Sequence, residues 1–139
     1  MNYLLDTCVL SEFTRHVPNS KLIQWLDTMD ESSLFLSVIT VGEIQRGITR
    51  LVESRRQKEL IIWMDTVINQ RFQHRILSIT AQTMLTWGAL TARLEKEGHP
   101  MPVMDSLIAA TVIENNLSLI TRNVADFSQC GIQIINPWE

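Results

Sequence analysis

Four acidic residues of this chain lie at positions where a carboxylate could do chemistry. Asp6 follows the apolar run Tyr3–Leu5, and the apolar pattern continues directly after it. An ionised group in such a run carries a heavy desolvation cost unless a partner compensates it. Glu43, Asp105 and Asp126 are the other three, and each lies close to the end of a predicted strand or the start of a predicted helix.

Short β-rich segments alternate along the chain with longer segments of helical periodicity. The predicted strands are Asn2–Asp6, Leu34–Val38, Arg75–Ile79, Leu117–Thr121 and Ile132–Ile135. The predicted helices are Val9–Arg15, Lys21–Met29, Thr40–Val52, Glu53–Phe72, Ala81–Glu97 and Val103–Asn116. The alternation predicts an α/β fold in which helices cover both faces of a parallel sheet.

The predicted elements place the four acids at one edge of this sheet. Asp6 ends the first strand, and Glu43 falls in the first turn of the helix after the second strand. Asp105 falls in the first turn of the helix before the fourth strand, and Asp126 in the loop after that strand. In a parallel α/β sheet, strand carboxyl ends and the following helix amino ends share the edge where ligands bind. We therefore expect the four carboxylates to lie close together.

Such a cluster of carboxylates needs compensation by positive charge. Two unit charges about 4 Å apart repel by roughly 4 kcal/mol at an effective dielectric constant near 20. Basic residues are scarce beside these positions, and Arg46 and Arg122 are the nearest in sequence. A hard divalent cation such as Mg²⁺ or Mn²⁺ takes oxygen ligands and keeps waters that a phosphate can displace. The spacing therefore favours a metal site.

Each acid also has a purely structural interpretation. The segment Thr40–Glu43 matches a capping box, in which the glutamate bonds back to the start of its own helix. Asp105 could be an N-cap or a first-turn acid favoured by the helix dipole. Asp126 could be a turn residue. Asp6 is the hardest to explain in this way, because its apolar run continues beyond it.

Composition limits the class of protein. The chain has 139 residues, 45% of them hydrophobic, with a mean hydropathy of +0.06, which predicts one globular domain spanning residues 1–139. No apolar run approaches a membrane span, and the amino terminus does not resemble a secretory signal. Cys8 and Cys130 are the only cysteines and form no metal motif, which favours a reducing cytoplasm. The net charge of −3 gives no support to nucleic-acid binding, so such a function must come from local features.

Four ordered motifs resemble a known family. The segments LLDTCVLSE, SVITVGEIQRGI, MDSLIAATVIENNLSLITRNVADF and INPWE resemble the PIN-domain nucleases, specifically the VapC and FitB toxins of bacterial toxin–antitoxin pairs. The resemblance runs from Asn2 to Trp138. It implies a three-layer α/β/α sandwich around a five-stranded parallel sheet of order 3-2-1-4-5, and metal-dependent cleavage of RNA.

The resemblance assigns the family's acids to positions of this chain. Its strand-end aspartate matches Asp6, its helix glutamate matches Glu43, and the aspartate of its penultimate core helix matches Asp105. The family places a fourth acid less uniformly, and here Asp126 is the candidate with Asn123 as its neutral neighbour. Further hydroxyl partners for the acids or their waters are Thr7 and Thr121, for which core packing is an equal alternative.

The resemblance also implies cofactors and partners. Mg²⁺ or Mn²⁺ would be held by Asp6, Glu43 and Asp105, with assistance from Asp126. Family members form homodimers and higher toxin–antitoxin assemblies, and a small antitoxin often inserts a basic side chain into the acidic pocket. DNA is contacted only through the antitoxin, and transfer RNA is a family-level expectation for the substrate.

An RNA substrate needs a positively charged binding surface on this acidic chain. The densest basic stretch contains Arg46, Arg50, Arg55, Arg56 and Lys58. Arg46 lies one helical turn beyond Glu43, where it could steer phosphate or pair with that glutamate. A solvated helix face, paired with neighbouring glutamates, explains the stretch equally well. The predicted helix Lys21–Met29 and the segment Ile61–Ile68 could form an antitoxin groove, with core packing as the alternative.

Two other functions compete with the nuclease hypothesis. A nucleic-acid-binding or regulatory subunit with decayed catalysis is disfavoured by the intact acids. A phosphatase with an aspartate nucleophile would need Asp-x-Asp after the first strand, and this chain has Asp6-Thr7-Cys8 instead.

Overall fold

A five-stranded sheet forms the centre of the molecule in the computed structural model, which describes all of residues 1–139. Its strands pair in the order β3-β2-β1-β4-β5, and every pair is parallel. They are β1 (Tyr3–Leu5), β2 (Leu34–Ser37), β3 (Ile76–Leu77), β4 (Ser118–Ile120) and β5 (Ile134–Ile135). The predicted strand order is thus confirmed, and β1 lies at the centre of the sheet.

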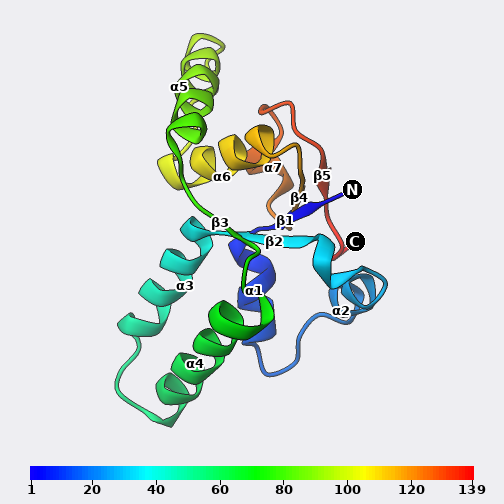
Figure 1. Ribbon diagram of the computed structural model, residues 1–139, viewed down its shortest axis with the longest axis vertical. Helices are drawn as coiled ribbons and strands as arrows, with labels where there is room; N and C mark the ends of the chain where they lie inside the picture. Colours follow the sequence, from blue (N-terminus) through cyan, green and yellow to red (C-terminus); the bar gives the residue numbers. More distant parts are fainter.

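Helices cover both faces of the sheet, which confirms the predicted three-layer arrangement (Figure 1). The first group comprises α1 (Thr7–Phe13), α2 (Ser20–Asp27), the 3-10 turn η1 (Glu31–Ser33), α3 (Val38–Arg50), α4 (Arg55–Thr66) and the π-helical turn η2 (Val67–Arg71). The second group comprises α5 (Ala81–Lys96), α6 (Val103–Glu114) and α7 (Val124–Phe127). Helix α5 extends away from the sheet (Figure 1) and packs against α6.

Alternation along the central strands builds two separate cores. Leu5 of β1 joins the hydrophobic cluster formed with α1 to α4, whereas Leu4 joins the cluster formed with α5 to α7. Ile120 and Leu119 of β4 divide between the two clusters in the same way. Successive side chains of a strand point to opposite faces, so an unbroken apolar strand is the expected pattern for a sheet covered on both sides.

The observed elements differ from the predicted ones mainly at their ends. Helix α3 begins at Val38, two residues before the prediction, because the Ser37 hydroxyl accepts a hydrogen bond from the Ile39 N–H and caps it. Strands β3 and β5 each have only two residues, fewer than predicted. Helix α7 was not predicted, since four residues are too short to show a helical period. No helix of the fold has both the length and the apolar character to span a bilayer.

Candidate functional site

Asp6 occupies the junction between β1 and α1. It caps α1, since its carboxylate accepts a hydrogen bond of 2.8 Å from the Thr7 N–H, and only 6% of the residue is exposed. The other carboxylate oxygen accepts a 2.7 Å hydrogen bond from the hydroxyl of Thr121, which follows β4. The Cys8 thiol lies 3.8 Å from the same oxygen. Two neighbouring strand ends thus hold this carboxylate in one orientation.

Burial raises the pKa of Asp6 above its ordinary value, and the negative charge of Asp126 raises it further. The hydrogen bonds from Thr121, Thr7 and Cys8 act in the opposite direction but do not offset the desolvation. The carboxylate at the end of the central strand is therefore costly to keep ionised, as its place in an apolar run predicts.

Glu43 lies in the second turn of α3, so its predicted place in the first turn is wrong. The capping-box interpretation is wrong as well, because Ser37 caps this helix and Thr40 lies buried within it. The Thr7 hydroxyl donates a 2.6 Å hydrogen bond to Glu43 Oε1 and lies 3.0 Å from the Thr40 hydroxyl. Glu43 is therefore tied to the amino end of α1, one residue after Asp6.

Asp105 lies in the first turn of α6, as predicted, but it does not cap the helix, whose N-cap is Pro102. Its half-buried carboxylate accepts no hydrogen bond from the protein. Desolvation raises its pKa, and the charges of Asp6, Asp126 and Glu43 raise it further, in that order. The charges of the other three predicted acids therefore all act on Asp105.

Asp126 belongs to α7 rather than to the predicted loop. Its residue is exposed and does not line the pocket that the other three acids share. Asn123, just before α7, does line it, and the Asn123 N–H donates to the Thr121 hydroxyl over 3.0 Å. Of the two candidates for the fourth position, Asn123 thus places an amide at the pocket, whereas the carboxylate of Asp126 acts on the other acids from outside it.

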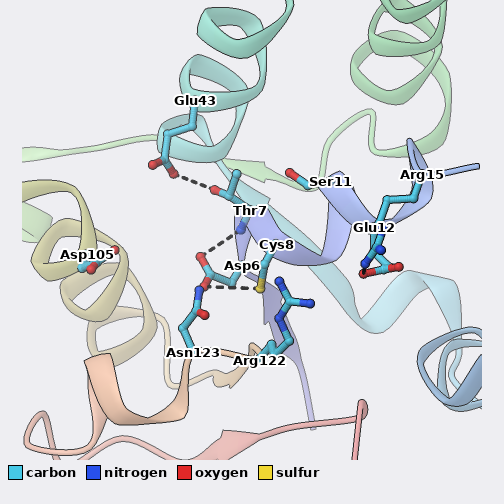
Figure 2. A pocket seen from close by; sticks show the side chains of 10 residues that line it. All are labelled: Asp6, Thr7, Cys8, Ser11, Glu12, Arg15, Glu43, Asp105, Arg122 and Asn123. Atoms are coloured by element: carbon cyan, nitrogen blue, oxygen red, sulfur yellow. Dashed lines mark hydrogen bonds and ion pairs between the residues drawn. The ribbon is translucent and has the colours of Figure 1, made fainter. Parts of the chain in front are cut away.

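The acidic pocket, as we name it, is a cavity of about 410 Å³ at the carboxyl edge of the sheet. Figure 2 shows Asp6, Glu43 and Asp105 approaching a common space from three different elements. The lining residues are Asp6, Thr7, Cys8, Ser11, Glu12, Arg15, Glu43, Asp105, Arg122 and Asn123. Of the auxiliary residues predicted from sequence, Thr7 and Asn123 line the pocket, and Thr121 supports it through Asp6.

Sequence reasoning did not single out Ser11, Glu12 or Arg15 as part of this pocket. All three lie on or just after α1, on a segment whose helical pattern alone does not show that it borders the acids. Arg46, in contrast, is exposed, lines no part of the acidic pocket and forms no ion pair with Glu43.

Part of the remaining basic stretch fits the alternative interpretation, in which its side chains form a solvated helix face and bond to groups of the protein. Arg55 pairs with Glu59 at 3.9 Å, and the Arg56 guanidinium donates to the Thr14 carbonyl oxygen. The pair between two exposed side chains on one helix contributes little stability.

The donor chemistry of the acidic pocket suits a hard divalent cation. Four carboxylates line it, three from the predicted acids and the fourth from Glu12, and the pKa values of Asp6 and Asp105 are raised by burial and by the neighbouring acids. A cation here would relieve this repulsion, and oxygen donors are the ligands that Mg²⁺ and Mn²⁺ prefer. In the present side-chain conformations, no three acidic, cysteine or histidine groups form a complete metal site.

Comparison with known proteins identifies the family. The model of the PIN domain matches residues 3–131. This chain belongs to the PIN-domain family. Toxin FitB of Neisseria gonorrhoeae is 30% identical over 135 residues, covering 97% of each chain. The VapC ribonuclease Y4jK of Sinorhizobium fredii is 28% identical over 136 residues, covering 98% of this chain and 97% of its own.

A solved structure extends the similarity of this PIN domain to three dimensions. The complex of FitAB bound to the IR36 DNA fragment contains a chain that superposes with a TM-score of 0.93 at 29% identity, covering 99% of this chain and 96% of that one. The resemblance to VapC and FitB proteins is thus confirmed across nearly the whole length of the domain.

Proposed function

We propose that this PIN domain is the toxin of a toxin–antitoxin pair and acts as a metal-dependent endoribonuclease. The observation that carries the proposal is the convergence of Asp6, Glu43 and Asp105 on one pocket at the carboxyl edge of the sheet. The names of the relatives support it, since one is a toxin and another a ribonuclease. The reaction is the hydrolysis of RNA phosphodiester bonds.

Asp6, Glu43 and Asp105 are the residues that would hold Mg²⁺ or Mn²⁺, with Asp126 contributing negative charge from outside the pocket. The bound ion supplies Lewis acidity, which lowers the pKa of a water and neutralises charge that develops on the phosphoryl oxygens. No histidine lines the pocket to activate the Ser11 hydroxyl or the Cys8 thiol as a nucleophile, so we assign this chemistry to the carboxylates.

The surrounding hydroxyls orient these carboxylates. The Thr121 hydroxyl donates a hydrogen bond to one carboxylate oxygen of Asp6, and the Thr7 N–H donates to the other. The hydroxyl of the same residue, Thr7, donates a hydrogen bond to Glu43 Oε1. Hydrogen bonds of this kind fix the direction of metal-binding carboxylates, so Thr7 and Thr121 act as positioning residues.

The partners we propose are an RNA substrate, a second copy of this chain and a small antitoxin. The FitB relative occurs in a complex of FitAB with a DNA fragment. We propose the equivalent assembly for this chain, with DNA contacted through the antitoxin. An antitoxin side chain of positive charge would suit the acidic pocket, because it would relieve the same repulsion as a metal ion.

A cleavage assay with purified, antitoxin-free protein tests the function. We expect the wild type to cleave a mixed-sequence RNA in Mg²⁺ or Mn²⁺ and to lose this activity in EDTA. Asp105→Asn removes one carboxylate whose side chain makes no hydrogen bond, and should reduce cleavage about a hundredfold or more. Asp65→Asn, an exposed acid on α4, is the matched control and should cleave normally.

Equal activity in the wild type and Asp105→Asn would contradict the metal–carboxylate mechanism. A wild type that binds RNA but cleaves none under any of these conditions would instead favour the alternative of a nucleic-acid-binding subunit.

A further inference from the structure

The acidic pocket contains more negative than positive charge, although its proposed substrate is a polyanion. Two arginines line it, and they are used differently. Arg15 pairs with Glu12 at 3.5 Å. Arg122 forms no ion pair, and its guanidinium donates no hydrogen bond within the protein. It is therefore the one cation of the pocket with its full charge and all its donors available.

Arg122 is nevertheless held in place. Its guanidinium carbon lies 5.5 Å from the centroid of the Trp138 ring, within the range of a cation–π interaction. Stacking of this kind occupies the flat face of a guanidinium and leaves the N–H groups along its edge free. Those edge donors have the fork geometry that matches two phosphate oxygens.

The tryptophan that supports Arg122 is itself anchored by a buried carboxylate. The Trp138 indole N–H donates to Glu12 over 3.3 Å, and the Asn19 N–H donates to the other oxygen of Glu12 over 3.0 Å. Glu12 is only 3% exposed. A rigid chain of contacts therefore connects the carboxyl end of α1, through Trp138, to the guanidinium at the pocket.

The backbone fixes Arg122 relative to the acids as well. Arg122 lies between Thr121, whose hydroxyl bonds Asp6, and Asn123, whose N–H bonds that same hydroxyl. A group held by Arg122 would thus have a fixed position relative to Asp6.

We infer that Arg122 is a substrate-positioning residue that binds a phosphate of the RNA strand beside the acidic pocket, with Trp138 and Glu12 as its support. The inference rests on the proposed ribonuclease function. It assigns to Arg122 the attraction for RNA phosphate that counteracts the repulsion from the acids of the pocket. A phosphate contact of this kind strengthens binding without selecting a base.

The test measures cleavage kinetics and RNA binding for Arg122→Gln and Arg122→Lys. Arg122→Gln should raise KM about tenfold, the size of one charge-assisted contact, while kcat changes little. The slope of log K against log salt for a non-cleavable 2′-O-methyl oligoribonucleotide should fall by about 0.7, the value for one phosphate contact on a single strand. Arg122→Lys should recover part of the affinity, since a lysine keeps the charge but not the fork.

Two further variants separate positioning from folding. Lys96→Gln, an exposed residue outside the pocket, makes the same change in net charge and should leave KM and the salt slope unchanged. Trp138→Leu removes the aromatic face and should raise KM in the same direction as Arg122→Gln, whereas Trp138→Phe should retain more of the affinity.

The outcomes distinguish this inference from the function on which it rests. If the wild type cleaves RNA but Arg122→Gln keeps its KM and salt slope, or loses only thermal stability, the inference is wrong and the ribonuclease stands. If the wild type cleaves nothing, yet binds the oligonucleotide with an Arg122-dependent salt slope, the ribonuclease proposal fails and the phosphate site stands.

Discussion

The two ends of α1 carry two buried carboxylates in opposite electrostatic situations. Asp6, at the amino end, is 6% exposed, and Glu12, at the carboxyl end, is 3% exposed. Burial raises the pKa of Asp6 in spite of its hydrogen bonds. Burial acts on Glu12 in the same direction, but the Asn19 N–H, the Trp138 indole and Arg15 outweigh it and lower the pKa. Burial alone therefore does not mark a reactive carboxylate.

What separates the two residues is the balance of partners around them. Glu12 has three donors, one of them an arginine, and its charge is compensated within the protein. Asp6 has hydroxyl, amide and thiol partners only, and it faces other acids across the pocket. An uncompensated acid beside others is the pattern expected of a functional site, whereas a compensated one stabilises the fold.

The largest expected effect is on catalysis and concerns Asp6. Asp6→Asn retains a side chain that caps helices well, so the fold should persist. Its cleavage rate should nevertheless fall about a thousandfold, because one proposed metal ligand is lost. Glu12→Gln, measured in the same assay, should keep kcat within a few fold. Loss of kcat in both variants would remove the distinction between the two ends of α1.

The next effect is on stability and concerns Glu12. Glu12→Ala leaves the Trp138 indole and the Asn19 N–H without their acceptor, so the free energy of unfolding should fall by about 2–3 kcal/mol. Urea titration followed by circular dichroism measures this change. Asp6→Asn should lose much less in the same experiment. A Glu12→Ala protein as stable as the wild type would show that this buried carboxylate is not structural.

The smallest effect is the dependence of stability on pH. The raised pKa of Asp105 means that the folded protein holds this proton more tightly than the unfolded chain. Its ionised form therefore destabilises the fold at pH 7, and the penalty is absent below the ordinary pKa of 3.8. In EDTA, Asp105→Asn should melt above the wild type at pH 7, and the difference should vanish on acidification to below that value.

Glu12→Gln should change the melting temperature at pH 7 in the opposite direction. The lowered pKa of Glu12 stabilises the fold above the ordinary value of 4.5, and this contribution is lost as the pH falls through the lower, folded-state value. The variant should thus melt below the wild type at pH 7 and approach it in acid. Melting differences of the same sign for both variants would contradict the comparison.

Sequence alone predicted the sheet order through the resemblance, and the order of the elements predicted that four acids converge at one edge. Asp6, Glu43 and Asp105 do line one pocket, because apolar strands and the helices after them fix which ends share an edge, whereas Asp126 lies outside that pocket. Sequence reasoning placed Glu43 in the first turn rather than the second because the predicted helix began two residues late, at Thr40. Ser37 continues the β-rich run, although its hydroxyl in fact caps α3.

The supporting network was not predictable from local pattern. Glu12 reads as an ordinary polar position of a short helix, and its partner Trp138 lies 126 residues away in sequence. Arg122 was recognised only as a nearby cation, because its stacking on Trp138 depends on how the end of the chain returns to α1. Contacts of this kind arise from tertiary packing rather than from any periodicity.

The central position of β1 has a consequence for synthesis of the protein in the cell. Asp6 follows β1, yet its hydroxyl partner Thr121 is 115 residues further along the sequence. The segment between them must therefore be translated before β4 can pair with β1 and bring Thr121 to Asp6. A nascent chain that has not reached β4 lacks this edge of the acidic pocket, so the pocket is assembled late in folding.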